Sequence, residues 1–245
     1  MTQAGLSLRF DRADTLSLAG LQRIRVNSPD IAPPQLSGRG RALAQNAWAE
    51  RLRSEYIGVM VMRHFHGLCV DLNAPMDVQE AALAMTLQEQ QHAALCADAL
   101  TALGGEPELS FDVEELQFTR SQAPLDEQLI DMLVGTFLVG EVVALALIKH
   151  TLKVVPNSPF RDVLKAIARD EVLHARIGSF TLAHIRSEQT PRWMRWPGDE
   201  FVRQSVQRAQ QAMAERDVID PAEKAAFKDD QLADELMACA IPPSQ

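Results

Sequence analysis

Cysteine, aromatic residues and strand signals are all scarce in this sequence. Its three cysteines, Cys69, Cys96 and Cys239, lie far apart, and no two of them form a Cys-x-x-Cys pair. This spacing excludes a rubredoxin-type or zinc-ribbon site and indicates no disulfide framework. Aromatic residues make up 5% of the chain, and no stretch alternates apolar and polar residues as a half-buried strand does. We therefore predict an all-α protein.

An excess of basic residues is also missing, because the formal net charge is −9. A surface that binds nucleic acid or an anionic membrane needs clustered Lys and Arg, so we expect neither partner. The longest apolar run, residues 133–148, is short for a membrane span and has Glu141 at its middle, which favours a buried core helix. The N-terminus lacks the basic-then-apolar pattern of a signal peptide, so we expect a cytoplasmic protein.

Long helical patterns fill the centre of the chain. They cover approximately residues 41–72, 76–103, 124–153 and 159–187, and two shorter ones follow at about 199–216 and 221–239. Pro and Gly mark their ends, and Ser158 is placed to cap the last long helix. The organisation that we predict has three parts: an N-terminal arm or covering segment at 1–40, a four-helix bundle at 41–187, and a helical extension at 188–245 that packs on the bundle.

Each long helix carries an apolar stripe at a spacing of three and four residues, which is typical of a bundle core. Near the middle of each stripe the residues become polar. These polar core positions are Glu55, Glu89, His92, Glu141, Glu171 and His174. Four buried carboxylates would each lose solvation energy and would repel one another, so either they are protonated or cations lie among them. Two divalent metal ions would balance the four charges, with neutral imidazoles completing the coordination.

The spacing of the glutamates and histidines supports a metal site. In Glu89-Gln90-Gln91-His92, and again between Glu171 and His174, the two side chains are one helical turn apart on one face, so both can reach one metal ion. A single Glu-x-x-His is a weak signal. The order Glu, Glu-x-x-His, Glu, Glu-x-x-His on four successive helices is a specific one.

This pattern resembles the ligand set of the ferritin-like superfamily of di-iron and di-manganese carboxylate proteins, which includes bacterioferritin, rubrerythrin, fatty-acyl desaturases and multicomponent monooxygenases. The resemblance covers about residues 41–187 and implies a ferritin-like four-helix bundle. It also implies roles for the six residues: terminal ligands of one iron at Glu55 and His92, terminal ligands of the other at Glu141 and His174, and bridging carboxylates at Glu89 and Glu171. Two iron ions are the implied cofactor, although manganese or a mixed pair also suits carboxylate and imidazole ligands.

Asp170 directly precedes the second Glu-x-x-His, as in the Asp-Glu-x-x-His form of several members of the superfamily. There the aspartate accepts a hydrogen bond from a metal-bound histidine of another helix, here His92, and such bonds fix the orientation of the imidazole. The alternative is a surface aspartate that pairs with Arg169 or Lys165. The equivalent position on the other helix holds Gln88, a weaker acceptor, so we expect unequal support of the two histidines.

Ferrous ions held in this way react with oxygen or peroxide in the superfamily, so the resemblance implies a non-haem di-iron oxygenase or oxidase that uses O2. Three features favour a small, apolar organic substrate: extra chain on both sides of the bundle, a segment at 106–123 long enough to cover an entrance, and apolar or small residues near the ligands. The small residues, which either leave room for a substrate or permit tight helix packing, are Gly58, Ala93, Gly140, Ala144 and Gly178.

No single subfamily is matched. The hydroxylases and desaturases place a threonine just after the glutamate that corresponds to Glu141, where this chain has Ala144 and Leu145. The sequence contains no rubredoxin domain, so the electron route of rubrerythrin is missing. Two other hypotheses stay open: a ferroxidase, peroxidase or iron-handling protein, and a metal-stabilised partner module without catalysis. A homodimer and an external electron donor are compatible with the enzyme hypothesis.

Other residues near the six have ordinary interpretations. Tyr56 directly follows the first ligand and points about 100° away from it, which disfavours radical storage. Glu50 lies off the stripe and is interpreted as a solvated residue, and His66 as a packed or capping histidine. Cys96 either lines a pocket or is a small buried core residue. We interpret the WMRW stretch at 193–196 as an aromatic clasp over the bundle.

Overall fold

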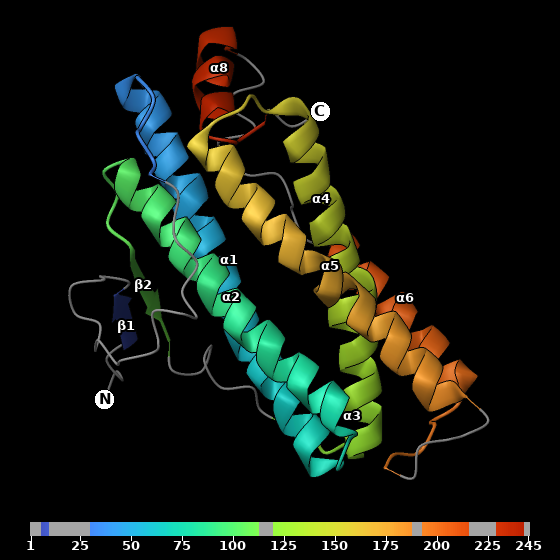
Figure 1. Cartoon of the computed structure of the whole chain (residues 1–245). Coiled ribbons are helices and arrows are strands. Elements are labelled where there is room, and N and C mark those ends of the chain that lie inside the picture. The colour runs from blue at the N-terminus through green and yellow to red at the C-terminus, as the bar shows by residue number, and fades with distance from the viewer. Residues whose placement is uncertain (1–5, 10–29, 113–119, 188–192, 216–228, 243–245) are drawn as a thin grey trace.

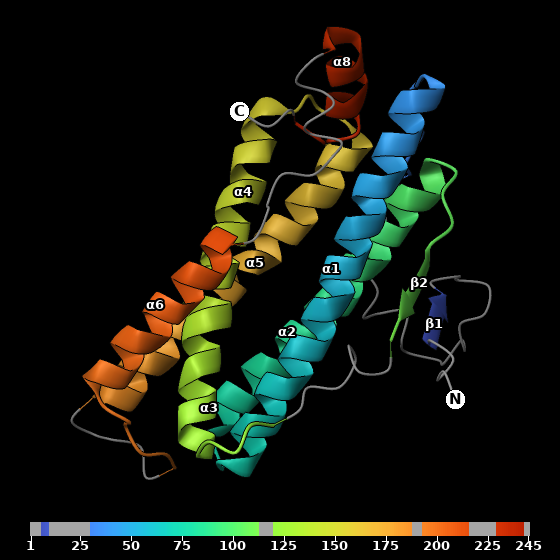
Figure 2. The same ribbon diagram turned by 180° about the vertical axis from the view of Figure 1, so that it is seen from behind.

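The computed structural model describes residues 6–9, 30–112, 120–187, 193–215 and 229–242 (Figure 1). Most of these residues are helical, which confirms the all-α prediction at this level. The long helical elements are α1 (Gly38–Asp71), α2 (Met76–Ala102), α3 (Leu125–Met132), η4 (Leu133–Gly140), α4 (Glu141–Val154) and α5 (Pro159–Arg186). Helix α1 packs along α2, α2 packs against α5, and α5 packs against η4 and α4 (Figure 2).

The helix ends lie close to their predicted places, because local capping decides them. Ser158 caps α5 by accepting a hydrogen bond from the backbone N of Arg161 at 3.1 Å, as predicted. Helix α2 ends just before Gly104, whose φ of +78° lies in the left-handed region that glycine adopts without strain. Helix α1 begins slightly earlier than predicted, since Ser37 accepts a hydrogen bond from Gly40 N.

The third long helix contains a backbone feature that the sequence did not predict. Its middle section, η4, is a π-helix of 8 residues between α3 and α4. The backbone N–H of Glu141 donates to the carbonyl oxygen of Thr136, five residues earlier, where an α-helix would use the residue four earlier. Glu141 therefore stands at the first position after a widened stretch of helix. π-Helical turns are rare and occur frequently at functional sites.

Two short strands depart from a purely helical chain. Strand β1 (Leu6–Arg9) pairs with β2 (Glu108–Phe111) in antiparallel fashion, with Leu6 opposite Phe111. In β2, Leu109 and Phe111 are buried while the two alternate residues are exposed. A strand of four residues is too short for such alternation to stand out in a sequence, and for this reason we missed it. The pair joins the predicted N-terminal arm to the 106–123 segment.

Two apolar clusters fill the interior, one on each side of the polar core positions. Trp48 packs against Phe160 in the first, with ring centroids 5.7 Å apart, and Phe65 packs against Phe137 in the second, at 4.8 Å. On α1, Glu55 lies between Trp48 and Phe65. Full burial of a large apolar side chain contributes about 1.5–3 kcal/mol to folding. The clusters therefore stabilise the helices on both sides of a polar layer that opposes folding by itself.

The C-terminal helices pack on the long ones. Helix α6 (Asp199–Glu215) lies against η4 and α3, and α8 (Asp230–Ala238) lies against the start of α1 (Figure 2). Trp48 Nε1 donates to the carbonyl oxygen of Cys239 at 3.1 Å. The helix predicted at 221–239 is observed from Asp230, and residues 216–228 lie outside the described part of the chain. Trp193 and Trp196 pack against the second apolar cluster, which agrees with the predicted aromatic clasp.

Among the described residues, one continuous helix, Leu125–Val154, is long and apolar enough to cross a membrane by length and composition. Its inward residues Leu133 and Phe137 are fully buried in the core. Its outward residues Val142 and Leu147 are 44% and 51% exposed, and only 39% of its most apolar stretch is buried. The helix predicted to be buried in the core is therefore buried along one face and exposed along the other.

Candidate metal centre

All six polar core positions meet at one level of the structure. Five of the side chains form two groups, each with candidate ligand atoms within 4.8 Å of one another: Glu55, Glu89 and His92 in one, and Glu89, Glu141 and His174 in the other. Glu55 comes from α1, Glu141 from α4, and the two Glu-x-x-His pairs from α2 and α5. Each group offers two carboxylates and one imidazole, which is a set that could hold one metal ion.

Glu171 lies between the two groups. Its Oε1 is 3.3 Å from His92 Nδ1, and its Oε2 is 3.1 Å from His174 Nδ1. Glu89 belongs to both groups, and its Oε1 is 3.1 Å from His174 Nδ1. Both carboxylates therefore lie where they could contact two cations. Glu55, whose Oε2 is 3.2 Å from His92 Nδ1, lies at one side only.

The outward nitrogen of each imidazole faces an acceptor. His174 Nε2 is 3.1 Å from Gln88 Oε1, and His92 Nε2 is 3.5 Å from Asp170 Oδ2. Asp170 also accepts a hydrogen bond from Nε of Arg169 at 2.9 Å, so the pairing with Arg169 is present, while His92 is in contact with the carboxylate without hydrogen-bonding to it. The contact with Gln88 favours the tautomer of His174 that carries its proton on Nε2. His92 Nε2 has no hydrogen bond of acceptable geometry in the described part of the chain, and only the negative charge of Asp170 favours a proton there. The lone pair of Nδ1 then points inward.

The inward atoms are the sharpest sign of a cation site. Nδ1 of His92, Nδ1 of His174 and Oε2 of Glu171 are buried, and none of them has a hydrogen-bond partner of acceptable geometry in the described part of the chain. Each Nδ1 nevertheless lies within 3.3 Å of two carboxylate oxygens. Electron pairs that face one another in an apolar interior need a cation or protons between them. Carboxylate and imidazole donors in this proportion fit iron or manganese.

The pKa values of the metal-free site also indicate that its carboxylates need positive charge among them. Burial raises the pKa of Glu141 to about 9, and the carboxylates of Glu171 and Glu89 add to the rise. Burial also raises the pKa of Glu89, to about 7, despite the opposing contact with His174. Burial lowers the pKa of His92, but Glu171 and Glu55 outweigh it and raise that pKa to about 11. Without metal, the site must therefore collect protons to balance its carboxylates.

The pKa values of His174 and Glu171 depend on the same two effects, burial and the charge of neighbouring groups. Burial lowers the pKa of His174, but Glu171 and Glu89 outweigh it and raise that pKa to about 10. Burial raises the pKa of Glu171, yet its contacts with both histidines dominate and lower that pKa to about 2. The metal-free cluster is thus a charged carboxylate held between two imidazolium rings, and protons occupy the place that metal ions would take.

Small residues around the site have two distinct roles. A Cβ added at Gly58 would lie 2.6 Å from Cδ of Glu89, so this glycine makes room for a candidate ligand. A Cβ added at Gly178 would lie 2.8 Å from Cβ of Phe137, so that glycine permits close packing of α5 on η4. Both glycines were predicted from the sequence, but their two roles could not be told apart. The role of each glycine depends on which helix faces it.

The nearby residues that received ordinary interpretations are placed as follows. Glu50 is exposed, and Cys96 is fully buried in the first apolar cluster. The ring of Tyr56 lies 5.5 Å from that of Phe111 on β2. Tyr56 thus packs on the strand that follows α2.

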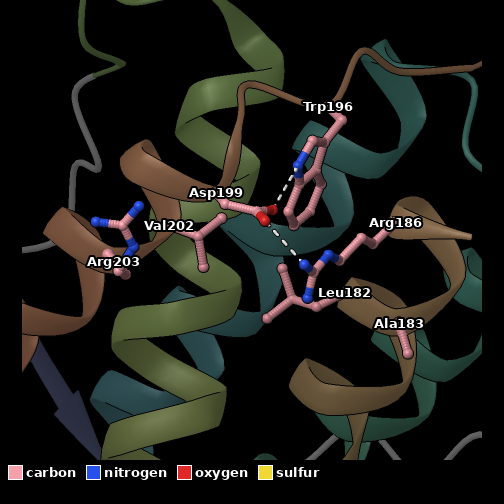
Figure 3. A pocket seen from close by; sticks show the side chains of 7 residues that line it. All are labelled: Leu182, Ala183, Arg186, Trp196, Asp199, Val202 and Arg203. Atoms are coloured by element: carbon pink, nitrogen blue, oxygen red, sulfur yellow. Dashed lines mark hydrogen bonds and ion pairs between the residues drawn. The ribbon is translucent and has the colours of Figure 1, made fainter.

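A separate hollow lies between the end of α5 and the start of α6 (Figure 3). It has a volume of about 380 Å³ and is lined by Leu182, Ala183, Arg186, Trp196, Asp199, Val202 and Arg203. Asp199 accepts from Arg186 at 2.8 Å and from Trp196 Nε1 at 3.2 Å, so its charge is already paired. Leu182 follows His174 by about two helical turns, roughly 12 Å along the axis. The hollow is therefore no part of the metal centre.

Comparison of the chain with models of protein families, with curated proteins and with solved structures finds no match.

Proposed function

We propose that the chain is a non-haem di-iron oxidoreductase, an oxygenase or oxidase that uses O2 to oxidise a small organic molecule. The proposal includes a ferritin-like arrangement of the helices that carry the ligands. The observation that supports it most is the pair of buried imidazoles whose Nδ1 atoms face carboxylate oxygens without a donor between them. Two divalent cations satisfy all six groups at once, and iron is the redox-active ion that the resemblance implies.

The residues of the chain would divide the work. When bound, the two iron ions supply the exchange of electrons with oxygen. Glu89 and Glu171 would hold both ions, and the outward partners Asp170 and Gln88 would keep the rings of His92 and His174 turned with Nδ1 inward. Ile167, at 1% exposure, lies one turn from Glu171 and helps to exclude water from the reacting groups.

An apolar substrate is supported by what surrounds the ligands. Buried apolar clusters lie on both sides of the polar layer, so a molecule near the metal ions would meet mostly hydrocarbon. The described part of the 106–123 segment lies against α1, where Arg53 donates to the carbonyl oxygen of Ser110 at 2.8 Å. This placement supports the proposed covering role of the segment. A homodimer and an external electron donor remain part of the proposal.

A second candidate is a ferroxidase or iron-handling protein, whose substrate is iron itself. The observation that favours it is the partial exposure of the two terminal carboxylates. The side chain of Glu55 is 16% exposed, and Glu141 is half-buried, whereas both histidines are fully buried. Carboxylates that reach towards solvent can pass iron ions inward.

Anaerobic loading with ferrous iron, followed by oxygen, separates the candidates. We expect two iron ions per chain and oxygen consumption that stops when those two ions are oxidised, unless a reductant and substrate are supplied. Hundreds of ferric ions per assembly would contradict the enzyme proposal and support iron handling. Two bound ions without any reaction with oxygen would leave a metal-stabilised partner module.

A further inference from the structure

The two histidines of the metal centre have unequal outer partners. His92 faces Asp170, a carboxylate, with Nε2 and Oδ2 3.5 Å apart, whereas His174 faces Gln88, a neutral amide, at 3.1 Å. The rest of the site is nearly symmetric, since each ion position has one terminal carboxylate and one imidazole and shares Glu89. The outer partners therefore form the clearest chemical difference between the two positions.

Asp170 is held in place by a second contact. Arg169 donates from Nε to Oδ1 at 2.9 Å and from Nη2 to Oδ2 at 3.3 Å, so both oxygens of the carboxylate are engaged on the solvent side. The Arg169 side chain is 68% exposed and the Asp170 side chain only 12%. The arginine thus fixes the carboxylate from outside while Oδ2 stays directed at His92. Within the described residues, no comparable ion pair holds Gln88.

A carboxylate partner makes an imidazole a stronger ligand than an amide partner does. The negative charge stabilises the positive charge that the ring gains when Nδ1 donates its electron pair to a metal ion, and it fixes the ring orientation. His92 Nε2 has no hydrogen bond of acceptable geometry among the described residues, so the Asp170 carboxylate acts on the ring through its charge, and the interaction of charges falls slowly with distance. Outer partners of this kind typically change metal affinity by about 10–100-fold.

We infer that the two metal positions are inequivalent. The position formed by Glu55, Glu89 and His92 binds the first divalent cation, and the position formed by Glu89, Glu141 and His174 binds the second more weakly. Asp170, anchored by Arg169, is the positioning residue that creates the difference. A form with one ion therefore accumulates when metal is scarce, and the weaker position can take a different divalent cation. This inference rests on the proposed function, because it requires that the site bind metal.

Titration of the metal-free protein with Co²⁺ tests the inference without any assay of activity. Absorption of the bound ion and calorimetry report each binding step. We expect two steps per chain whose Kd values differ by roughly tenfold or more. Asp170→Asn should weaken the first step by about 10–100-fold and leave the second almost unchanged. Gln88→Glu should tighten the second step and bring the two Kd values closer together.

Matched variants keep the test clear. Arg169→Ala should weaken the first step by less than Asp170→Asn does, and it remains informative if Asp170→Asn fails to fold. Lys165→Ala is the control, because Lys165 contacts Asp162 on the exposed side of the same helix and should leave both steps unchanged. Two equal steps in the unaltered protein, or a first step insensitive to both Asp170→Asn and Arg169→Ala, would overturn the inference. Failure of the unaltered protein to bind Co²⁺ at all would overturn the proposed metal site instead.

Discussion

The α1–α2 pair and the α3–α5 part of the chain carry the same series of candidate ligands on different backbones. Helices α1 and α2 are regular from end to end, and they supply Glu55, Glu89 and His92. The other part reaches Glu141 only after the π-helix η4, and it is there that the close packing of Gly178 on Phe137 occurs. A repeated order of side chains therefore does not require a repeated backbone. Matched substitutions in the two parts should therefore differ in their effects on metal binding and on stability.

The largest effect is expected at the shared carboxylates. Glu89→Gln and Glu171→Gln should each remove both iron ions, since Glu89 belongs to both candidate groups and Glu171 lies between their histidines, and affinity should fall by roughly 100-fold or more. Glu55→Gln and Glu141→Gln should each remove one ion only. Iron counted per chain after desalting measures this, with the exposed Glu50→Gln as control. Loss of a single ion in Glu171→Gln would contradict its bridging position.

The π-helix is expected to matter for one ion position. Deletion of Val139, a half-buried residue of η4, should convert the stretch towards α-helix, remove the widened turn and shift Glu141 relative to the helices that face it. The second ion should then be lost while the first is retained. Val139→Ala, which keeps the backbone intact, is the matched control. A deletion variant that still binds two ions would show that Glu141 does not depend on η4.

The two glycines are expected to give opposite results in the two parts. Gly178→Ala should lower the free energy of unfolding by about 1–3 kcal/mol, because the added methyl group meets Phe137 and the backbone of η4. Gly58→Ala should instead displace Glu89 and weaken metal binding, with little change in the stability of the metal-free protein. Urea denaturation and a metal titration of both variants measure the contrast. Equal stability losses in both variants would contradict the separate roles.

The last prediction is a dependence of metal affinity on pH. At pH 7 and without metal, the raised pKa values leave protons on Glu141, His92 and His174, and metal ions must displace them. Fewer protons remain to be displaced as the pH rises towards the pKa of Glu89, about 7, and that of Glu141, about 9. Affinity for Mn²⁺ should therefore increase between pH 6 and 8, by up to roughly tenfold per pH unit for each proton released. A constant affinity would show that the metal-free site is not protonated.

Side-chain placement was predictable from the sequence where helical periodicity alone decides it. The six polar core positions follow from a spacing of three and four residues, and the structure brings all six together. The start of α5 directly after Ser158 was predictable from capping chemistry. Contacts between distant segments were not predictable. The pairing of β1 with β2 and the burial of Phe111 depend on where separate segments meet in space.

Two features of the site itself also escaped prediction. An isolated Gly58 gives no sign of which side chain it makes room for, because Glu89 comes from another helix. The π-helix before Glu141 has no pattern as strong as the 3.6-residue period, and its glycines Gly135 and Gly140 are equally compatible with loose helix packing. For Asp170, the sequence offered two partners as alternatives, and in the structure Arg169 donates a hydrogen bond to it while His92 is in contact without one.

The central claim, that two metal ions lie among these six side chains, is tested most directly by crystals of the iron-loaded protein. Diffraction data collected on both sides of the iron absorption edge show iron independently of any assumed ligand. We predict two anomalous peaks in the polar layer between the two apolar clusters, with Glu89 and Glu171 contacting both of them. A map without anomalous density at Glu89 and Glu171, from protein loaded under conditions that saturate binding, would contradict the account.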